Sequence, residues 1–457
     1  MFVAQDSKIY KIFNFIEKPI LYITVLFIII EGPSVYSYAQ FGFSWLVNVF
    51  RIIVAILLFS LIIINVFRAQ IVRSMIKKWL ILCAVYYFVV ILELAATFTV
   101  IGVKGYLYFY GIVLPLLFTY FSLKMCVKEG YAFFYAFADI VFIISIISLF
   151  FWLFGSTLGI ITTNESIIVS FGDPFESPSY LGIYFEHQTV NVFGIENVIR
   201  NQGIFCEGPL FAAYLGLALC VEIYMRPYKQ TIKNRELFIQ NIRQFNVIKT
   251  IILFTTLITT LTSTGYILVI LFLISMFFLY PINRRYAFNF KLILGIVLLI
   301  IAAAGVLYVI LAKSDSMSFR VRFDDYVACF KAWLTSPLFG VGAMNQEPIL
   351  AFISDFRASN YGLSSGLGNV FAQGGIILFV IVYCLPLIYW LFKTVKNKNW
   401  SMLYFVVAFI MIFALTVIDH TVILMSMLAI GYANIVITGQ YSMFYFPQKA
   451  KIDNQLC

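Results

Sequence analysis

The chain has 457 residues, of which 62% are hydrophobic and only 11% are charged, and its mean hydropathy is +0.97. Soluble domains carry about 25% charged residues, so this composition excludes a soluble protein and predicts a chain that crosses a membrane several times. The net charge of +10 could indicate a nucleic-acid partner, but the distribution of the basic residues excludes one, as described below.

The N-terminus and the metal-binding residue types exclude further classes. Charged residues between positions 8 and 18 precede the first apolar run and no small-residue cleavage site follows it, so we expect no cleavable signal sequence. The seven cysteines are scattered without a CxxC pair, and His187 and His420 are the two histidines. A zinc site is therefore not expected. No G-x-S-x-G, Walker A or DxD-like nucleotide-sugar signature stands out either, so we expect no metal and no bound cofactor.

The apolar runs predict an all-α polytopic membrane protein with about twelve transmembrane helices in a single integral membrane domain (1–457), since a span needs about 20 apolar residues. The predicted segments are 19–31, 44–66, 79–101, 105–124, 131–155, 207–226, 248–262, 265–281, 290–312, 369–392, 401–418 and 421–440. Only Ser263-Thr264 separates the seventh segment from the eighth. These two segments are either two helices or one bent, re-entrant element.

The lysines and arginines predict the orientation, because cytoplasmic loops carry an excess of them. With both termini inside, 23 of the 31 basic residues fall in inner segments. An even number of spans agrees with this arrangement. The positive charge thus sets the topology, and nucleic acid is excluded as a partner.

Two outer loops are long, at about 156–206 and about 313–368. In the first, the β-prone runs 180–187 and 189–193 are expected to pair as a hairpin. The second begins with a predicted amphipathic helix over 316–333, followed by a turn-rich stretch at 337–343. Long structured loops of a compact protein are usually functional.

These loops hold basic residues that run against the charge bias, and the planar fork of arginine suits a phosphate or pyrophosphate. The alternative is that each is a solvated charge or a partner of Glu196, Asp324 or Asp355. The glycine and proline residues around Arg200 and around Arg320 and Arg322 favour the ligand role there. The loop residues in question are Arg200, Arg320, Arg322, Lys331 and Arg357.

Glu207 is predicted in the first turn of the sixth helix, two residues before Pro209. It could cap the helix, where the dipole favours a carboxylate and lowers its pKa, or it could act as a base or as an acceptor for a sugar hydroxyl. The dipole argues against a strong base.

Two other positions carry candidate ionisable groups. Glu93 lies within the third span, where an ionisable residue indicates function by default, and an ion pair with Arg51 is the competing explanation. Asp419 and His420 fall at the outer turn between the last two helices. His420 is either a general base or an interfacial loop residue.

Four motifs in chain order resemble those of Wzy-type O-antigen and polysaccharide polymerases, over about 160–395. The first is Arg200-x-x-Gly-x-Phe-x-Glu-x-Pro209, after the β-prone loop. Thr262-Ser-Thr-Gly-Tyr266 resembles the Ser-rich turn of that family. Ser318-x-Arg-x-Arg322 with Pro337-Leu-x-Gly-Val-Gly342 resembles the second outer loop that polymerases share with O-antigen ligases, and Gly374-Gly375-Ile376 resembles the start of the next segment.

The resemblance implies a GT-C-like fold, no metal, and a glycosyl transfer at the outer face of the bacterial inner membrane. The substrate would be an oligosaccharide linked to undecaprenyl pyrophosphate, with a chain-length regulator and a flippase as candidate partners. Arg200 and Arg320 or Arg322 would bind the pyrophosphate, and Glu207 would orient or deprotonate the acceptor hydroxyl. The other candidate substrate-binding residues are Arg357, Lys331, Asp324, His420 and Glu93.

Two alternatives remain open. O-antigen ligases resemble this layout but have a histidine late in the second outer loop, where this chain has Ser364–Asn369 without one. This difference favours a polymerase and leaves the general base open among Glu207, Glu347, Asp324 and His420. A lipid-linked oligosaccharide flippase would fit six spans on either side of the basic loop 226–249, although the two halves show no similarity.

Overall fold

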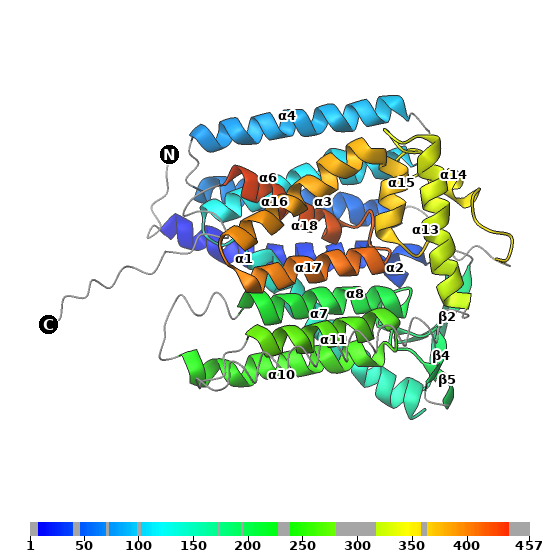
Figure 1. Cartoon of the computed structure of the whole chain (residues 1–457). Helices are drawn as coiled ribbons and strands as arrows, with labels where there is room; N and C mark the ends of the chain where they lie inside the picture. Colours follow the sequence, from blue (N-terminus) through cyan, green and yellow to red (C-terminus); the bar gives the residue numbers. More distant parts are fainter. Residues whose placement is uncertain are drawn as a thin grey trace, which may run out of the picture.

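The computed structural model describes residues 8–39, 46–69, 73–97, 102–171, 174–192, 195–226, 238–279, 317–357 and 363–437. These residues form a bundle of roughly parallel and antiparallel helices (Figure 1). The strands and the helices of residues 317–335 and 347–350 are gathered at one end of the bundle. We call this end the loop end. The predicted ninth span, 290–312, lies outside the described residues.

Within the described residues, seven helical segments are long and apolar enough to cross a membrane, and four shorter apolar helices accompany them. The first group contains α1 (Lys8–Glu31), α3 (Leu46–Arg68), α4 (Arg73–Ala96), α5–η1–α6 (Val103–Tyr106, Leu107–Val113, Leu114–Cys126), α7–η2 (Ala132–Phe151, Trp152–Thr157), α8–η3 (Gly208–Cys220, Val221–Met225) and α15–η4–α16 (Gly366–Leu378, Phe379–Cys384, Leu385–Lys396). The second contains α10 (Phe238–Thr259), α11 (Ser263–Leu279), α17 (Trp400–Leu415) and α18 (Val422–Val436). The protein is therefore a mostly helical, membrane-spanning protein, and eleven of the twelve predicted segments coincide with helices.

Residues 260–262 separate α10 from α11, and the two helices pack against each other. Of the two arrangements that the sequence left open, the structure has two helices.

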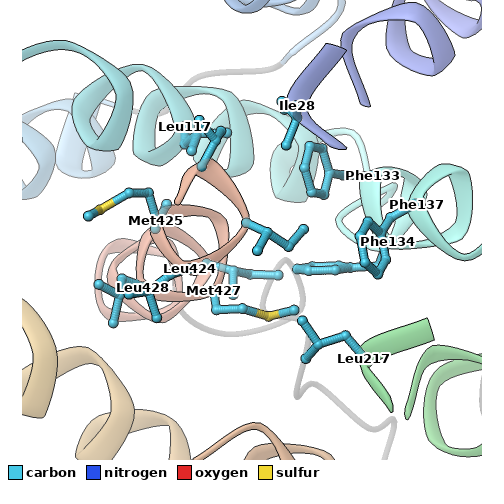
Figure 2. Packing of buried hydrophobic residues seen from close by; sticks show 14 of the residues in the cluster. Ile28, Leu117, Phe133, Phe134, Phe137, Leu217, Leu424, Met425, Met427 and Leu428 are labelled. Atoms are coloured by element: carbon cyan, nitrogen blue, oxygen red, sulfur yellow. The ribbon is translucent and has the colours of Figure 1, made fainter. Parts of the chain in front are cut away.

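Helix α8 is the most enclosed span, with 94% of its apolar window buried. It packs against α7, α10, α11 and α17, and Gly216 permits close contact with Leu268 and Ile412, as small residues do between membrane helices. Next to it, Phe134 of α7 meets Met427 of α18 in the main core (Figure 2). Helix α4 is the most exposed span and lies along one edge of the bundle (Figure 1).

The first long loop, 156–206, forms two small antiparallel sheets. Strands β1 (Glu165–Val169), β2 (Phe175–Tyr180) and β3 (Tyr184–Phe185) make the first sheet, and β4 (Thr189–Val192) and β5 (Ile195–Ile199) make the second. The predicted pairing of 180–187 with 189–193 is therefore wrong. Leu181 and Gly182 adopt positive φ angles and turn β3 back onto β2, so β4 is left to pair with β5.

The second long loop contains α13 (Met317–Thr335), which confirms the helix predicted over 316–333. Its apolar face packs on α15 through a small core that contains Ala328, Ala332 and Ala372. Two further short helices are α14 (Glu347–Leu350) in this loop and α2 (Val35–Tyr38) after α1. Helices α13 and α14 lie beside the strands at the loop end (Figure 1).

The two glycine motifs of this region form one backbone joint. Helix α15 is interrupted at Gly375, whose φ of 58° is left-handed, and the segment before Gly342 fills the gap. Gly342 N donates to Gln373 O at 3.0 Å and Ile376 N donates to Pro337 O at 3.0 Å. A Cβ on Gly340 would lie 2.2 Å from Gln373 O. The close approach requires glycine at positions 340 and 375. This joint fixes the second loop to the bundle.

Candidate functional site

A cavity of about 310 Å³ lies at the loop end. Its charged lining residues are Arg200, Glu207 and Arg322, which come from the first loop, the start of α8 and the second loop. The remaining lining residues are Phe171, Gln188, Pro209, Leu210, Val321, Leu363, Ser364, Leu415, Thr416 and Val417. The cavity thus joins segments more than 200 residues apart in sequence.

The segment 201–206 holds Arg200 in place. This segment follows β5 and is almost completely buried. Its backbone forms hydrogen bonds with the ends of other elements. Asn201 N donates to Thr259 O of α10 at 3.1 Å, Cys206 N donates to Pro33 O at 3.2 Å, and Ile204 O accepts from Val35 N at 2.9 Å. The position of Arg200 is therefore fixed by α1, α2 and α10 together.

The Arg200 guanidinium has few partners. Its Nη1 donates to Gln188 Oε1 at 3.4 Å, while its Nε is buried without a hydrogen-bond partner among the described residues. Burial lowers the pKa of Arg200, Arg322 acts in the same direction, and Glu207 opposes them. No described carboxylate forms a salt bridge with Arg200. A partly buried cation without a direct salt bridge is suited to an anionic ligand.

Glu207 is the N-cap residue of α8, but its side chain makes no capping hydrogen bond. The capping alternative is therefore wrong. Burial raises the pKa of the Glu207 carboxyl, and the charges of Arg200 and Arg322 only partly oppose this rise. The lower pKa that the helix dipole predicts for Glu207 is therefore not found. The carboxyl forms no hydrogen bond or salt bridge with another described residue. A carboxyl of raised pKa with free oxygens is a competent general base.

Of the two neighbouring arginines in α13, the structure places only Arg322 in the cavity lining. Arg322 forms no hydrogen bond or salt bridge with any residue that the structure describes. Arg320 is exposed, and its guanidinium lies 4.6 Å from the centroid of the Phe356 ring. Residues two apart on a helix point in different directions, and the sequence motif could not decide between them.

Arg357 and Asp324 pair with each other, outside the cavity lining. Arg357 Nε lies 2.9 Å from Asp324 Oδ2, and Arg357 also pairs with Asp325. Burial raises the pKa of Asp324, but hydrogen bonds from Ser354 and the charge of Arg357 outweigh burial, so this pKa is lowered overall. The two residues therefore cross-link the second loop. For Arg357 this agrees with the alternative that a loop arginine is the partner of a nearby carboxylate.

Two further loop candidates, Lys331 and Glu347, are exposed and do not line the cavity.

Glu93 connects α4 to the second loop. Its Oε1 accepts from Ala343 N at 3.3 Å and from Thr97 Oγ1 at 3.2 Å. Arg51 instead lies 3.4 Å from Glu31, so the proposed Arg51–Glu93 pair is wrong. Glu93 does not line the cavity.

His420 belongs to a buried hydrogen-bond network and does not line the cavity. Met344 N and His420 Nε2 both approach Gln373 Oε1, at 2.7 and 2.8 Å. Because that oxygen is an acceptor, His420 carries its proton on Nε2. Gln373 donates in turn to Asn369, which donates to Asp419. Burial lowers the pKa of His420 to about 4 and raises the pKa of Asp419 to about 7. His420 is thus a neutral member of a hydrogen-bond network that links α15 to the turn before α18.

Some residues near the cavity were not predicted as site residues. Thr262, of the threonine-rich turn, lies against Gly208, since a Cβ there would be 3.2 Å from Thr262 Cγ2. Tyr266 from the same turn interacts electrostatically with Arg200. The sequence did single out the motif 262–266, but it assigned no function to any residue of that motif. Gln188 carried no signal, because it lies between two β-prone runs.

The fold and the site together define a helical membrane protein with a charged cavity where its two long loops meet. Comparison with models of known protein families and with characterised proteins found no match to this chain. Within the described ranges, no group of three or more histidine, cysteine, aspartate or glutamate residues is arranged to hold a metal ion.

Proposed function

We propose that the protein polymerises oligosaccharide repeat units linked to undecaprenyl pyrophosphate, by glycosyl transfer at the outer face of the bacterial inner membrane. One observation carries the proposal: Arg200, Glu207 and Arg322 line the same cavity, and none of them forms a salt bridge with a described residue. The residues come from motifs that resemble those of Wzy-type polymerases.

In this proposal the two arginines bind the pyrophosphate of the donor. A guanidinium can hold phosphate oxygens through two parallel charge-assisted hydrogen bonds. When the donor sugar departs, negative charge builds up on the pyrophosphate, and two fixed cations stabilise it without reorganisation. The leucine and valine residues of the lining exclude water and strengthen these interactions.

Glu207 acts as the general base. The acceptor hydroxyl oxygen attacks the anomeric carbon of the donor sugar, the bond from that carbon to the pyrophosphate oxygen breaks, and the pyrophosphate keeps the electron pair. The hydroxyl proton passes to Glu207, whose raised pKa makes proton acceptance more favourable.

The proposed topology has twelve spans in a GT-C-like arrangement, with both termini in the cytoplasm. It is supported by α1 and α18, which run in opposite directions relative to the loop end, because Ser34 after α1 pairs with Phe205 and residues 415–417 before α18 line the cavity. The start of α1 and the end of α18 therefore lie at the other end of the bundle. Excess positive charge at that end agrees with a cytoplasmic location.

A polymerase fits better than a ligase or a flippase. Ser364 lines the cavity in the region where ligases, by resemblance, carry a histidine. A flippase would need its polar groups near the middle of the bilayer, whereas the charged cavity here lies between the loops.

The product of a strain that lacks the gene tests this assignment. We expect a single repeat unit still joined to its acceptor, with long chains restored by the wild-type gene and not by Arg200→Lys. A complete absence of capped acceptor would contradict the polymerase and indicate a ligase or a flippase.

A further inference from the structure

An apolar groove of about 230 Å³ lies between α4 and α6 at the end of the bundle opposite the loop end. It is separate from the cavity described above. Its lining residues are Val66, Met75, Ile76, Trp79, Thr119, Ser122, Leu123, Cys126, Val436 and Ile437. A smaller cavity of about 10 Å³, lined by Cys83 and Phe118 among others, lies further along the same two helices, towards the middle of the bundle.

The hydroxyl and thiol side chains of the groove are already satisfied within α6, whereas Trp79 Nε1 has no hydrogen-bond partner among the described residues. Thr119 Oγ1 donates to Pro115 O at 2.8 Å, Ser122 Oγ donates to Phe118 O at 2.8 Å, and Cys126 Sγ donates to Ser122 O at 3.2 Å. Apart from this indole N–H, the groove offers a hydrocarbon surface. Between Thr119 and Cys126 the helix rises about 10 Å, which is a third of a hydrocarbon core of about 30 Å.

Three basic residues without carboxylate partners lie within two residues of lining residues of this groove. Arg73, Lys78 and Lys128 are exposed, and none forms a salt bridge with a described residue. Lys78 directly precedes Trp79 of the lining, and Lys128 follows Cys126 by two residues.

The nearby buried cations differ from these residues. Arg68 and Lys124 both pair with Glu17 and with Glu129, and Lys124 lies 2.8 Å from Glu17. The charges that stabilise the helix bundle are thus neutralised, while the charges around the groove are left for an external anion.

We propose that this groove binds one anionic phospholipid of the adjacent leaflet. An acyl chain lies between α4 and α6, and the phosphate contacts Arg73, Lys78 and Lys128. The complementary charge favours an anionic headgroup over a zwitterionic one. This site is independent of the proposed glycosyl transfer.

The test uses purified full-length protein in a neutral detergent, with the shift of the unfolding midpoint measured against added lipid. Phosphatidylglycerol should bind more tightly than phosphatidylcholine with the same acyl chains. Each basic contact is worth about fivefold in affinity, so Lys78→Gln with Lys128→Gln should weaken phosphatidylglycerol binding about 25-fold.

A matched control removes the same charge elsewhere. Lys77 lies on the far side of α4 from the groove, because successive helical residues are about 100° apart, and Lys393 is on α16. Lys77→Gln with Lys393→Gln should leave the affinity within about twofold. Equal losses in the two double variants, or equal binding of the two lipids, would overturn the proposal.

A second variant tests the groove itself. Thr119→Trp fills the hydrocarbon surface and keeps the basic residues, so phosphatidylglycerol binding should fall about tenfold or more. Unchanged affinity in this variant would overturn the placement of the acyl chain. If this variant does not fold, the lysine variants still decide the headgroup site.

Discussion

Charged residues are used differently at the two ends of the bundle. At the loop end, Arg200, Glu207 and Arg322 share a cavity and form no salt bridge with a described residue. At the opposite end, the buried Arg68 and Lys124 both pair with Glu17 and Glu129. Breaking a buried pair leaves an uncompensated charge, so the paired groups support the fold. The unpaired groups are available to a ligand.

The largest effect should follow substitution of Arg200 by lysine. Arg200→Lys keeps the charge but loses the planar fork, so it should reduce chain extension about 100-fold or more, the effect of removing a donor that stabilises developing charge. The length distribution of the polysaccharide measures this loss. Arg320→Lys is the matched control, because Arg320 is exposed and outside the cavity lining. A normal ladder from Arg200→Lys would remove Arg200 from the site.

Two arginines of the same loop sharpen the comparison. Arg357 is paired with Asp324 and Asp325, so Arg357→Gln should lower stability by about 3–5 kcal/mol. Arg322→Gln should change stability by no more than about 0.5 kcal/mol and still reduce activity strongly. Thermal unfolding and chain extension of both variants separate these outcomes. Equal stability losses would mean that the distinction between paired and unpaired arginines is wrong.

The pH dependence of activity tests Glu207. Burial raises its pKa, so activity should rise with pH through a value above the ordinary glutamate pKa of about 4.3. Glu207→Gln should lower activity about 10- to 100-fold and remove this acid limb. An identical acid limb in Glu207→Gln would assign the base to another group.

Stability should change with pH in the opposite direction. A carboxyl whose pKa is raised by folding contributes stability that is fully present at low pH and is lost as the pH rises through the folded-state pKa. Glu207→Gln should therefore reduce the loss of stability as the pH rises. An unchanged dependence of the unfolding midpoint on pH would contradict the burial of this carboxyl.

The smallest effect is expected for His420. Its neutral ring supports a hydrogen-bond network, so His420→Asn should keep activity within about tenfold, whereas loss of a general base costs about 100- to 10,000-fold. The acid limb of the pH profile should not move. A larger loss of activity, together with a shift of the acid limb of the pH profile, would identify His420 as the general base.

The sequence predicted the helices well and the side-chain partners poorly. Long apolar runs predict spans because length and hydropathy are local properties, and the helix over 316–333 followed from its pattern. The strand pairing was wrong because the positive φ angles at Leu181 and Gly182 determine it. Such short strands have weak preferences of their own.

Tertiary contacts explain the remaining differences. Only the fold brings Arg357 to Asp324 and Glu93 to Ala343, since each pair is far apart in sequence. Likewise, the dipole argument for Glu207 used a local effect, whereas burial by distant segments raises its pKa. The convergence of the motifs near 200 and 320 on one cavity could be expected from their resemblance but not from their spacing.

The most direct test of the central claim is extension of lipid-linked repeat units by the purified protein in detergent, without an ion gradient. The folded wild-type protein and Arg320→Lys should produce longer chains and release undecaprenyl pyrophosphate, and Arg200→Lys should do neither. If the folded wild-type protein fails to lengthen the chains when donor and acceptor are both intact, the cavity is not the site of a glycosyl transfer.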